Sequence, residues 1–242
     1  MNRKRISVAM ATYNGEKYIR EQIDSILVQL GEGDEIIISD DGSSDSTINI
    51  INSYEDSRIV VIQGPRNGIV KNFENSIINC TKEIIFLADQ DDVWKNNKVE
   101  KVLEAFEDKS AILVMHDNEM TDECLNVINQ SFFQFRGCKK GLINNLIKNS
   151  FIGCCCAFKK DLVKEMVPFP NNIPMHDQWI GLVASICGKV VFLNDRLMLY
   201  RRHGKNNSDF KRNTFFRMLI IRKNLLIDLL KYRFRRFFNG KN

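Results

Sequence analysis

The sequence predicts an α/β fold in which a Rossmann-like, mostly parallel sheet is flanked by helices. Short apolar segments of strand length alternate with segments of helical periodicity along the first hundred residues. The apolar strand 84–88 ends directly in three carboxylates. Open sheets of this kind bind ligands at the carboxyl ends of their strands. A ligand site is therefore expected at that edge of the sheet.

The composition fits either one α/β domain or a domain with an added subdomain. The chain has 242 residues, of which 44% are hydrophobic and 27% charged. The basic start leads into a short strand, which is not the pattern of a secretory signal, and no apolar run reaches transmembrane length. Seven cysteines, three of them consecutive at 154–156, match neither a disulfide framework nor a zinc site. We expect a reduced, cytoplasmic protein.

Three strand-to-helix units lead to the acidic turn. The strands are expected at 6–11, 35–39 and 59–62, and the helices after them at 16–28, 48–54 and 69–80. The strands are rich in small and β-branched apolar residues, and the helices carry apolar residues three or four positions apart. Ser44 or Asp45 is expected to cap the second helix. Such alternation predicts right-handed crossovers between parallel strands.

Polar residues after these strands are candidate ligand contacts. Asp40 and Asp41 end the second strand and could accept hydrogen bonds from a ligand. Lys71 lies in the first turn of the third helix, where a cation opposes the helix dipole. An anionic ligand nearby would explain that placement, and a solvent-facing Lys71 explains it equally.

The acidic turn itself contains Asp89, Asp91 and Asp92. Carboxylates this close repel one another, and a divalent cation such as Mg²⁺ or Mn²⁺ would remove the repulsion. The alternative is an acidic turn in which Asp92 caps a helix that begins at about Val93.

The second half is less regular. Strands are expected at 111–115, 151–158, 189–193 and 197–200, and helices at 142–149, 159–166 and from about 175 onward. His116 is interpreted as a polar residue at a strand end. Residues 117–140 are interpreted as a loop-rich insertion, whose phenylalanines could equally belong to the core. The three consecutive cysteines are interpreted as small core residues, because no basic neighbour in the sequence would activate a thiol.

Three motifs in this order resemble those of family-2 inverting glycosyltransferases. They are Ala11-Thr12-Tyr13-Asn14-Gly15, Ser39-Asp40-Asp41-Gly42-Ser43-Ser44-Asp45 and Leu87-Ala88-Asp89-Gln90-Asp91-Asp92-Val93-Trp94. A fourth segment, 200–204, resembles bacterial rhamnosyltransferase-like members. The resemblance covers about residues 5–207. It implies a GT-A fold, a nucleotide-sugar donor such as a UDP- or dTDP-sugar, a glycan or lipid-linked acceptor, and Mn²⁺ or Mg²⁺.

The resemblance also implies roles for single residues. The metal ligands would be Asp91, Asp89 and His203. The donor contacts would be Thr12, Tyr13, Asn14, Asp40, Asp41, Lys71, Asp89, Gly153, Arg201 and Lys205, with the basic residues around a diphosphate, as suits guanidinium geometry. The family normally has no acid that protonates the leaving group, and the metal stabilises the charge on it instead.

The resemblance assigns the general base to Asp177. Inverting transfer needs one carboxylate to take the proton of the acceptor hydroxyl. Asp177 begins a helix after a proline-containing loop, so it could also be only an N-cap. His176 could orient the site or contact a phosphate.

The C-terminal segment differs in character from the rest. Residues 211–242 hold ten Lys or Arg and one acid, Asp228, whereas the remainder has a net charge of −4. Apolar residues at helical spacing predict a basic amphipathic helix. This helix could dock on the anionic inner face of the cell membrane, or it could pack on the domain. No motif indicates nucleic-acid binding. The expected division is a GT-A domain at 1–209, with a nucleotide-sugar half at about 1–115 and an acceptor half at about 116–209, followed by the helix at 210–242.

Two functions stay open from the sequence. The first is a metal-dependent enzyme that transfers a hexosyl or deoxyhexosyl group in bacterial surface polysaccharide synthesis. The second is a non-catalytic nucleotide-sugar-binding or scaffold protein on the same fold. The presence of Asp41, Asp89, Asp91, Asp177 and His203 together favours the enzyme.

Overall fold

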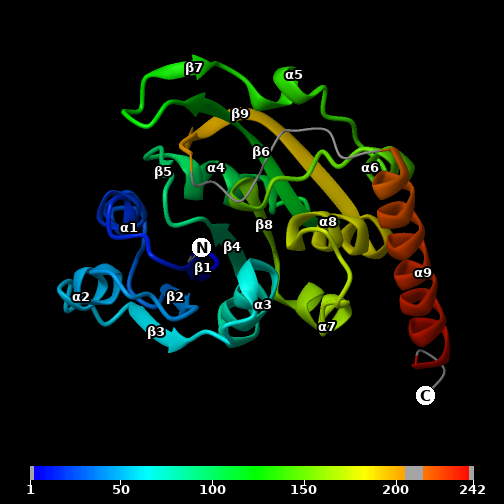
Figure 1. The fold of residues 1–242 in the computed structure, drawn as a ribbon, viewed down its shortest axis with the longest axis horizontal. Helices are drawn as coiled ribbons and strands as arrows, with labels where there is room; N and C mark the ends of the chain where they lie inside the picture. The colour runs from blue at the N-terminus through cyan, green and yellow to red at the C-terminus, as the bar shows by residue number, and fades with distance from the viewer. Residues whose placement is uncertain (1–2, 205–214, 240–242) are drawn as a thin grey trace.

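The structure, a computed structural model, describes residues 3–204 and 215–239 (Figure 1). Its strands form a nine-stranded sheet in the order β3-β2-β1-β4-β8-β6-β9-β5, with β7 paired to β6. The predicted Lys205 lies outside the described residues. Among those described, no helix combines the length and the apolar character needed to cross a bilayer.

The first half of the sheet is parallel, as predicted. It consists of β1 (Ile6–Thr12), β2 (Glu35–Asp40), β3 (Ile59–Gln63) and β4 (Ile84–Ala88). β1 pairs with both β2 and β4 in parallel register, so Thr12 lies opposite Asp40 and Met10 opposite Ala88. The carboxyl ends of these strands therefore meet at one edge. Every residue of β1, β2 and β4 is buried, because helices cover the sheet.

The second half mixes strand directions. It contains β5 (Val93–Trp94), β6 (Ala111–Thr121), β7 (Val127–Asn129), β8 (Cys156–Lys159) and β9 (Lys189–Arg201). β8 runs antiparallel to β4 and β6, whereas β9 runs parallel to β6 and antiparallel to β5. The end of β9 thus returns to the edge where β4 ends.

The helices flank this sheet. They are α1 (Ile19–Leu27), α2 (Thr47–Asn52), α3 (Gly68–Asn79), α4 (Lys98–Ala105), α5 (Phe132–Arg136), α6 (Leu142–Ile147), α7 (Val163–Met166), α8 (His176–Cys187) and α9 (Phe215–Asn239), with 3₁₀ turns at Gly153–Cys155 and Lys160–Leu162. α1 buries Ile19, Ile23 and Ile26, the positions that its sequence period predicts. Each such side chain contributes about 1.5–3 kcal/mol on burial. α9 runs along one edge of the molecule (Figure 1).

Three sequence expectations are corrected in the second half. The strand expected at 151–158 is reduced to β8, because residues 153–155 form a 3₁₀ turn. The two strands expected at 189–193 and 197–200 are one continuous strand, β9. β6 continues through His116 to Thr121, so His116 lies inside a strand and is fully buried. The cysteines at 154–156 are buried, as expected of core residues.

α8 packs closely against the segment that precedes the 3₁₀ turn. A Cβ built on Gly181 would lie 2.2–2.4 Å from three ring atoms of Phe151. Both residues are in contact with the core, and α8 carries Asp177 at its start. The missing side chain at Gly181 therefore sets the distance between α8 and the loop around Gly153.

Gly181→Ala is expected to destabilise the fold by about 1–3 kcal/mol, because the added methyl group overpacks the Phe151 ring. This exceeds the gain in helix propensity, which is at most about 1 kcal/mol. Urea unfolding of the full chain measures the change. Gly204→Ala is the matched control, since a Cβ there meets nothing within 4 Å. Equal stability of Gly181→Ala and wild type would contradict this packing.

Candidate functional site

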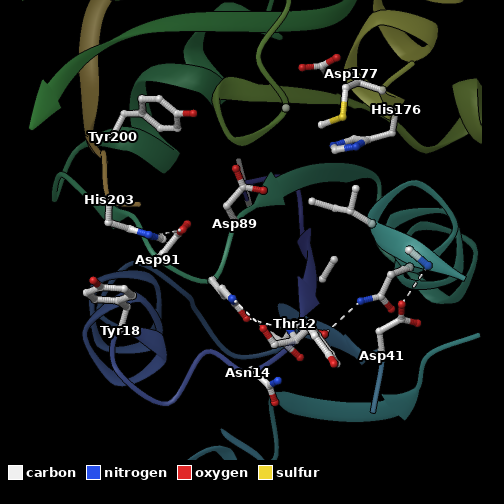
Figure 2. A pocket seen from close by; sticks show the side chains of 18 of the residues that line it. Thr12, Asn14, Tyr18, Asp41, Asp89, Asp91, His176, Asp177, Tyr200 and His203 are labelled. Carbon is white, nitrogen blue, oxygen red and sulfur yellow. Dashed lines mark hydrogen bonds and ion pairs between the residues drawn. The ribbon is translucent and has the colours of Figure 1, made fainter. Parts of the chain in front are cut away.

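A cavity of about 990 Å³ lies at the carboxyl ends of β1 and β4 (Figure 2). Its wall also includes the start of α8 and the residues after β9. It brings together predicted residues that are far apart in the sequence. These are Thr12, Tyr13, Asn14, Asp41, Asp89, Asp91, Gly153, Asp177 and His203.

One end of the cavity is built by the loops after β1 and β2. The Asp41 carboxylate accepts hydrogen bonds from the backbone N–H groups of Arg66 (2.6 Å) and Gly68 (3.1 Å). Asn72 of α3 donates to the carbonyl oxygen of Thr12 at 3.2 Å. Asp41 thus fixes the loop that enters α3 and lines the cavity beside it.

The loop after β1 is held by a glutamine from the acidic turn. Gln90 accepts from the backbone N–H of Tyr13 at 2.9 Å and donates to its carbonyl oxygen at 3.1 Å. A Cβ on Gly15 would lie 2.4 Å from the Gln90 side-chain oxygen, so a larger residue there would displace the end of this side chain. Asn14 has a positive φ of 48°, which asparagine tolerates, and accepts from the N–H of Ser44. The ring of Tyr13 is left 57% exposed at the cavity.

The acidic turn forms the middle of the cavity. The Asp91 carboxylate lies 2.7 Å from Nε2 of His203, and the His203 ring stacks on Tyr18 with centroids 4.9 Å apart. Burial and the neighbouring Asp91 raise the pKa of Asp89 to about 7. Burial also raises the pKa of Asp92 well above its usual range. A cation near the turn would therefore favour the ionised form of these two carboxyl groups.

This donor set fits a hard divalent cation. Asp89 and Asp91 supply carboxylate oxygens at the cavity wall, the ligand type that suits Mn²⁺ and Mg²⁺, and the His203 ring nitrogen lies beside Asp91. The ligand atoms that lie within 4.8 Å of one another belong to a different trio, Asp89, Asp92 and Cys154. Asp92 and Cys154 are fully buried, and a thiol is a poor partner for these ions, so we assign that trio to the support of the turn.

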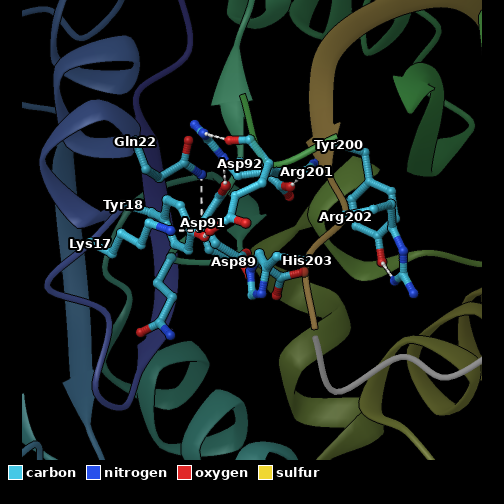
Figure 3. Close-up of polar contacts among 12 residues, drawn as sticks. Lys17, Tyr18, Gln22, Asp89, Asp91, Asp92, Tyr200, Arg201, Arg202 and His203 are labelled. Carbon is cyan, nitrogen blue, oxygen red and sulfur yellow. Dashed lines mark hydrogen bonds and ion pairs between the residues drawn. The ribbon is translucent and has the colours of Figure 1, made fainter. Parts of the chain in front are cut away.

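Arg201 contacts the acidic turn without lining the cavity (Figure 3). Its guanidinium donates to the carbonyl oxygens of Asp91 (2.8 Å) and Glu123 (2.7 Å), and it forms an ion pair with Glu21. Its backbone N–H donates to Asp92 at 3.0 Å. The residue is only 4% exposed and does not line the cavity. This corrects the expectation that Arg201 surrounds a diphosphate.

Three further sequence expectations are corrected by the contacts. Asp92 is not a helix cap, because α4 begins only at Lys98. Asp40 is buried and accepts from Thr12, Gly42 and Ser43, so it shapes the loop rather than the cavity. Lys71 pairs with Glu74 and donates to the Phe169 carbonyl oxygen, outside the cavity.

Asp177 faces this turn from the opposite wall of the cavity (Figure 2). It is the second residue of α8, and the N-cap position belongs to Met175, so Asp177 is not the cap. Its carboxylate accepts from Asn149 at 3.3 Å and from the N–H of Gln178. Burial raises its pKa to about 6. Asp177 is thus a carboxylate at neutral pH with a basicity above that of an exposed aspartate.

His176 lies beside Asp177 as a neutral ring. It stacks on Phe73 at a centroid distance of 4.0 Å and is 2% exposed. Burial lowers its pKa to about 3. Neither ring nitrogen has a hydrogen-bond partner among the described residues. A Cβ on Gly153 would lie 2.7 Å from Nε2, so glycine is what lets the ring approach this loop.

The sequence reasoning missed several residues of the cavity wall. They are Lys17, Tyr18, Arg66, Asn72, Gln90, Glu123 and Tyr200. Tyr18 lies at the N-cap position of α1, and its hydroxyl donates to Glu123 at 2.7 Å. Glu123 lies in the turn after β6, for which the sequence gives no functional signal.

Comparison with known families decides the assignment. The profile described as "Glycosyl transferase family 2" matches residues 7–167. The chain belongs to glycosyl transferase family 2. The family prediction from the three motifs is thereby confirmed.

Curated family-2 relatives match most of this chain. The glycosyltransferase GlyG of Streptococcus pneumoniae is 31% identical over 81% of this chain and 70% of its own length. The dTDP-rhamnosyl transferase RfbG of Shigella flexneri is 29% identical over 81% and 72%. A UDP-Glc:α-D-GlcNAc-diphosphoundecaprenol β-1,3-glucosyltransferase of Escherichia coli, WfgD, is 30% identical over 62% and 57%. The match to an uncharacterized glycosyltransferase of Nostoc covers 66% of that protein. This chain therefore spans about two thirds of the length of such relatives.

Solved structures agree on the fold. Staphylococcus aureus TarS in complex with UDP-GlcNAc superposes with a TM-score of 0.71 at 19% identity, over 92% of this chain and 66% of that one. A mannosyltransferase from Pyrobaculum calidifontis, in complex with GDP-Man and Mn²⁺, gives 0.66 at 18% identity, over 85% and 59%. These likenesses support the GT-A fold that the sequence predicts.

Arg201→Ala is expected to destabilise the protein by about 2–4 kcal/mol, because two part-buried carbonyl groups lose their donor and a buried side chain is removed. Thermal and urea unfolding measure the loss. Arg202→Ala is the matched control: its neighbouring guanidinium lies over the Tyr200 ring and is less buried, so the change should stay within about 1 kcal/mol. A stable Arg201→Ala protein that fails to bind UDP would instead favour the diphosphate contact.

Proposed function

We propose that this protein is an inverting glycosyltransferase that moves a sugar from a nucleoside diphosphate donor to an acceptor hydroxyl. One arrangement carries the proposal. A carboxylate with a raised pKa, Asp177, faces the acidic turn of Asp89 and Asp91 across a single cavity. One wall suits an anionic leaving group with its cation, and the other suits a proton acceptor.

The donor nucleotide would lie over the loops after β1 and β2. Asp41 and the Thr12 region offer oxygen acceptors there, and the exposed ring of Tyr13 offers an apolar face for a base. Asp89, Asp91 and His203 would hold the divalent cation. When bound, that cation would neutralise the diphosphate and the charge that develops on it as the glycosidic bond breaks.

Asp177 would take the proton of the acceptor hydroxyl. Its hydrogen bonds to Asn149 and Gln178 orient the carboxylate, and its buried setting favours proton uptake. The neutral His176 next to it has ring nitrogens without partners among the described residues, so it could hydrogen-bond the acceptor or the donor sugar. Attack from the Asp177 side, opposite the leaving diphosphate, inverts the anomeric centre.

The substrate classes follow from the relatives. We propose a UDP- or dTDP-sugar as donor and a lipid-linked glycan as acceptor, in bacterial surface polysaccharide synthesis on the cytoplasmic side of a membrane. The support is that RfbG is a dTDP-rhamnosyl transferase, that WfgD takes UDP-Glc and a diphosphoundecaprenol acceptor, and that TarS has been solved with UDP-GlcNAc.

Removal of the cation is expected to weaken UDP binding at least about tenfold, since the diphosphate would then face bare carboxylates. Asp91→Asn should bind UDP weakly both in Mn²⁺ and in EDTA. Isothermal calorimetry on the full chain makes the comparison. Asp195→Asn, which changes an exposed acid on β9, should behave as wild type. Equal UDP affinity of wild type in Mn²⁺ and EDTA would exclude the metal assignment.

Asp177→Asn is expected to reduce transfer about a hundredfold or more, because the amide cannot accept the proton. UDP affinity should hardly change. The wild-type rate should rise with pH up to about 6 and then level off, since the base must be ionised and its pKa is raised to about 6.

The assay is sugar transfer from a panel of UDP- and dTDP-sugars to a GlcNAc-diphospholipid. Asp161→Asn, an exposed acid before α7, is the matched control. A folded Asp177→Asn protein with near-normal transfer would place the base elsewhere. A wild type that binds UDP but transfers no sugar would favour the non-catalytic binding protein.

A further inference from the structure

α9 is a helix with two apolar faces. Its inner face is anchored to the domain by Leu225, Leu229 and Tyr232, which are all buried. The Tyr232 hydroxyl donates to Glu165 at 2.7 Å, and its ring meets Trp179 of α8 edge-on. The inner face of α9 therefore packs on the domain, which is one of the two alternatives that the sequence leaves open. The outer face is left without a role by this packing.

The outer face carries large apolar side chains in solvent. Their exposed fractions lie between 37% and 65%, and their spacing of three, four or seven residues places them on one side of the helix. They are Leu219, Ile220, Leu226, Ile227, Leu230 and Phe234. A contiguous apolar surface of this kind on a packed helix marks an interaction site.

Cationic side chains surround this face. At 100° per residue, Lys223 falls in the middle of the apolar stripe, Arg233 on one border and Lys231 on the other. The only acid of the described α9 is Asp228, whose side chain is 17% exposed and lies 3.7 Å from Lys231. The exposed side of the helix is thus apolar and positively charged at once.

We propose that the outer face of α9 docks in the plane of an anionic lipid bilayer. Apolar side chains would enter the boundary between headgroups and acyl chains, and Lys223, Lys231 and Arg233 would meet anionic headgroups. A second copy of the chain fits this face less well, because pairing α9 with itself sets cations against cations in either orientation.

This docking deepens the proposed function and rests on it for its purpose. α6 links the two places: Arg222 of α9 donates twice to the carbonyl oxygen of Ile147, and Asn149, just beyond α6, donates to Asp177. Gln178 of α8 also donates to the carbonyl oxygen of Asn145. Figure 1 shows α9 alongside α6 and α8. α6 therefore lies between the docked helix and the loop that orients Asp177. A lipid-linked acceptor held at the membrane would be close to this carboxylate.

Vesicle sedimentation of the full chain tests the inference. The protein should bind vesicles of phosphatidylglycerol and phosphatidylcholine at low salt, bind phosphatidylcholine alone weakly, and release as salt rises. Ile220→Gln/Leu230→Gln should lower partitioning at least about tenfold, and so should Lys223→Glu/Arg233→Glu.

Matched variants control for surface polarity and net charge. Val127→Gln/Ile128→Gln removes two apolar side chains on β7 whose exposed fractions, 49% and 59%, equal those of Leu230 and Ile220. Lys101→Glu/Lys109→Glu makes the same charge change at α4 and just after it. Both controls should bind vesicles as wild type does. Thermal melts confirm that each variant is folded.

Light scattering and UDP calorimetry on the same proteins separate the outcomes. Absence of binding to anionic vesicles at low salt overturns the inference, and so do controls that lose binding as much as the α9 variants. A wild-type dimer that Ile220→Gln/Leu230→Gln makes monomeric, with no vesicle binding, assigns the face to a second copy. A protein that binds UDP with Mn²⁺ but ignores vesicles overturns the docking and leaves the proposed function standing.

Discussion

The buried guanidinium of Arg201 holds the acidic turn on which the site depends. Three carboxylates within four residues repel one another, and burial makes their charge more costly still. Arg201 contacts the backbone carbonyl of Asp91 rather than its carboxylate. The turn is therefore stabilised through its backbone by a cation, while the Asp91 carboxylate contacts His203. The Arg201 guanidinium also lies over the ring of Tyr18, and the His203 ring stacks on that same tyrosine.

Burial divides the acids at the strand ends into different roles. Asp40 and Asp41 are neighbours in the sequence. The Asp40 carboxylate accepts hydrogen bonds from Thr12, Gly42 and Ser43, whereas Asp41 lines the cavity. Asp89 and Asp177 face the same cavity and both have raised pKa values, but burial alone raises that of Asp177, whereas neighbouring acids add to the effect of burial at Asp89. A cation can relieve Asp89, and a proton from an incoming hydroxyl can relieve Asp177. Position alone therefore gives the two carboxylates different surroundings.

The parallel half of the sheet could be predicted from sequence because its signals are local. A buried strand such as Ile84–Ala88, its turn and the next helix can each be recognised within a dozen residues. The fate of single charges could not be predicted in this way. Arg201 pairs with Glu21 and donates to the backbone of Glu123, and Lys71 donates to the backbone of Phe169. Each of these partners is distant in the sequence. Likewise, 151–158 has the apolar pattern of one strand, but residues 153–155 form a 3₁₀ turn against which the distant His176 packs.

β9 has a consequence for how the chain can vary in length. This strand pairs with β6 over most of its thirteen residues and delivers Arg201 to the inside and His203 to the cavity. Because side chains alternate between the faces of a strand, one inserted or deleted residue would exchange the inward and outward positions. The buried guanidinium would then point to solvent and a neighbour would replace it. Insertions and deletions in homologous chains should therefore avoid β9.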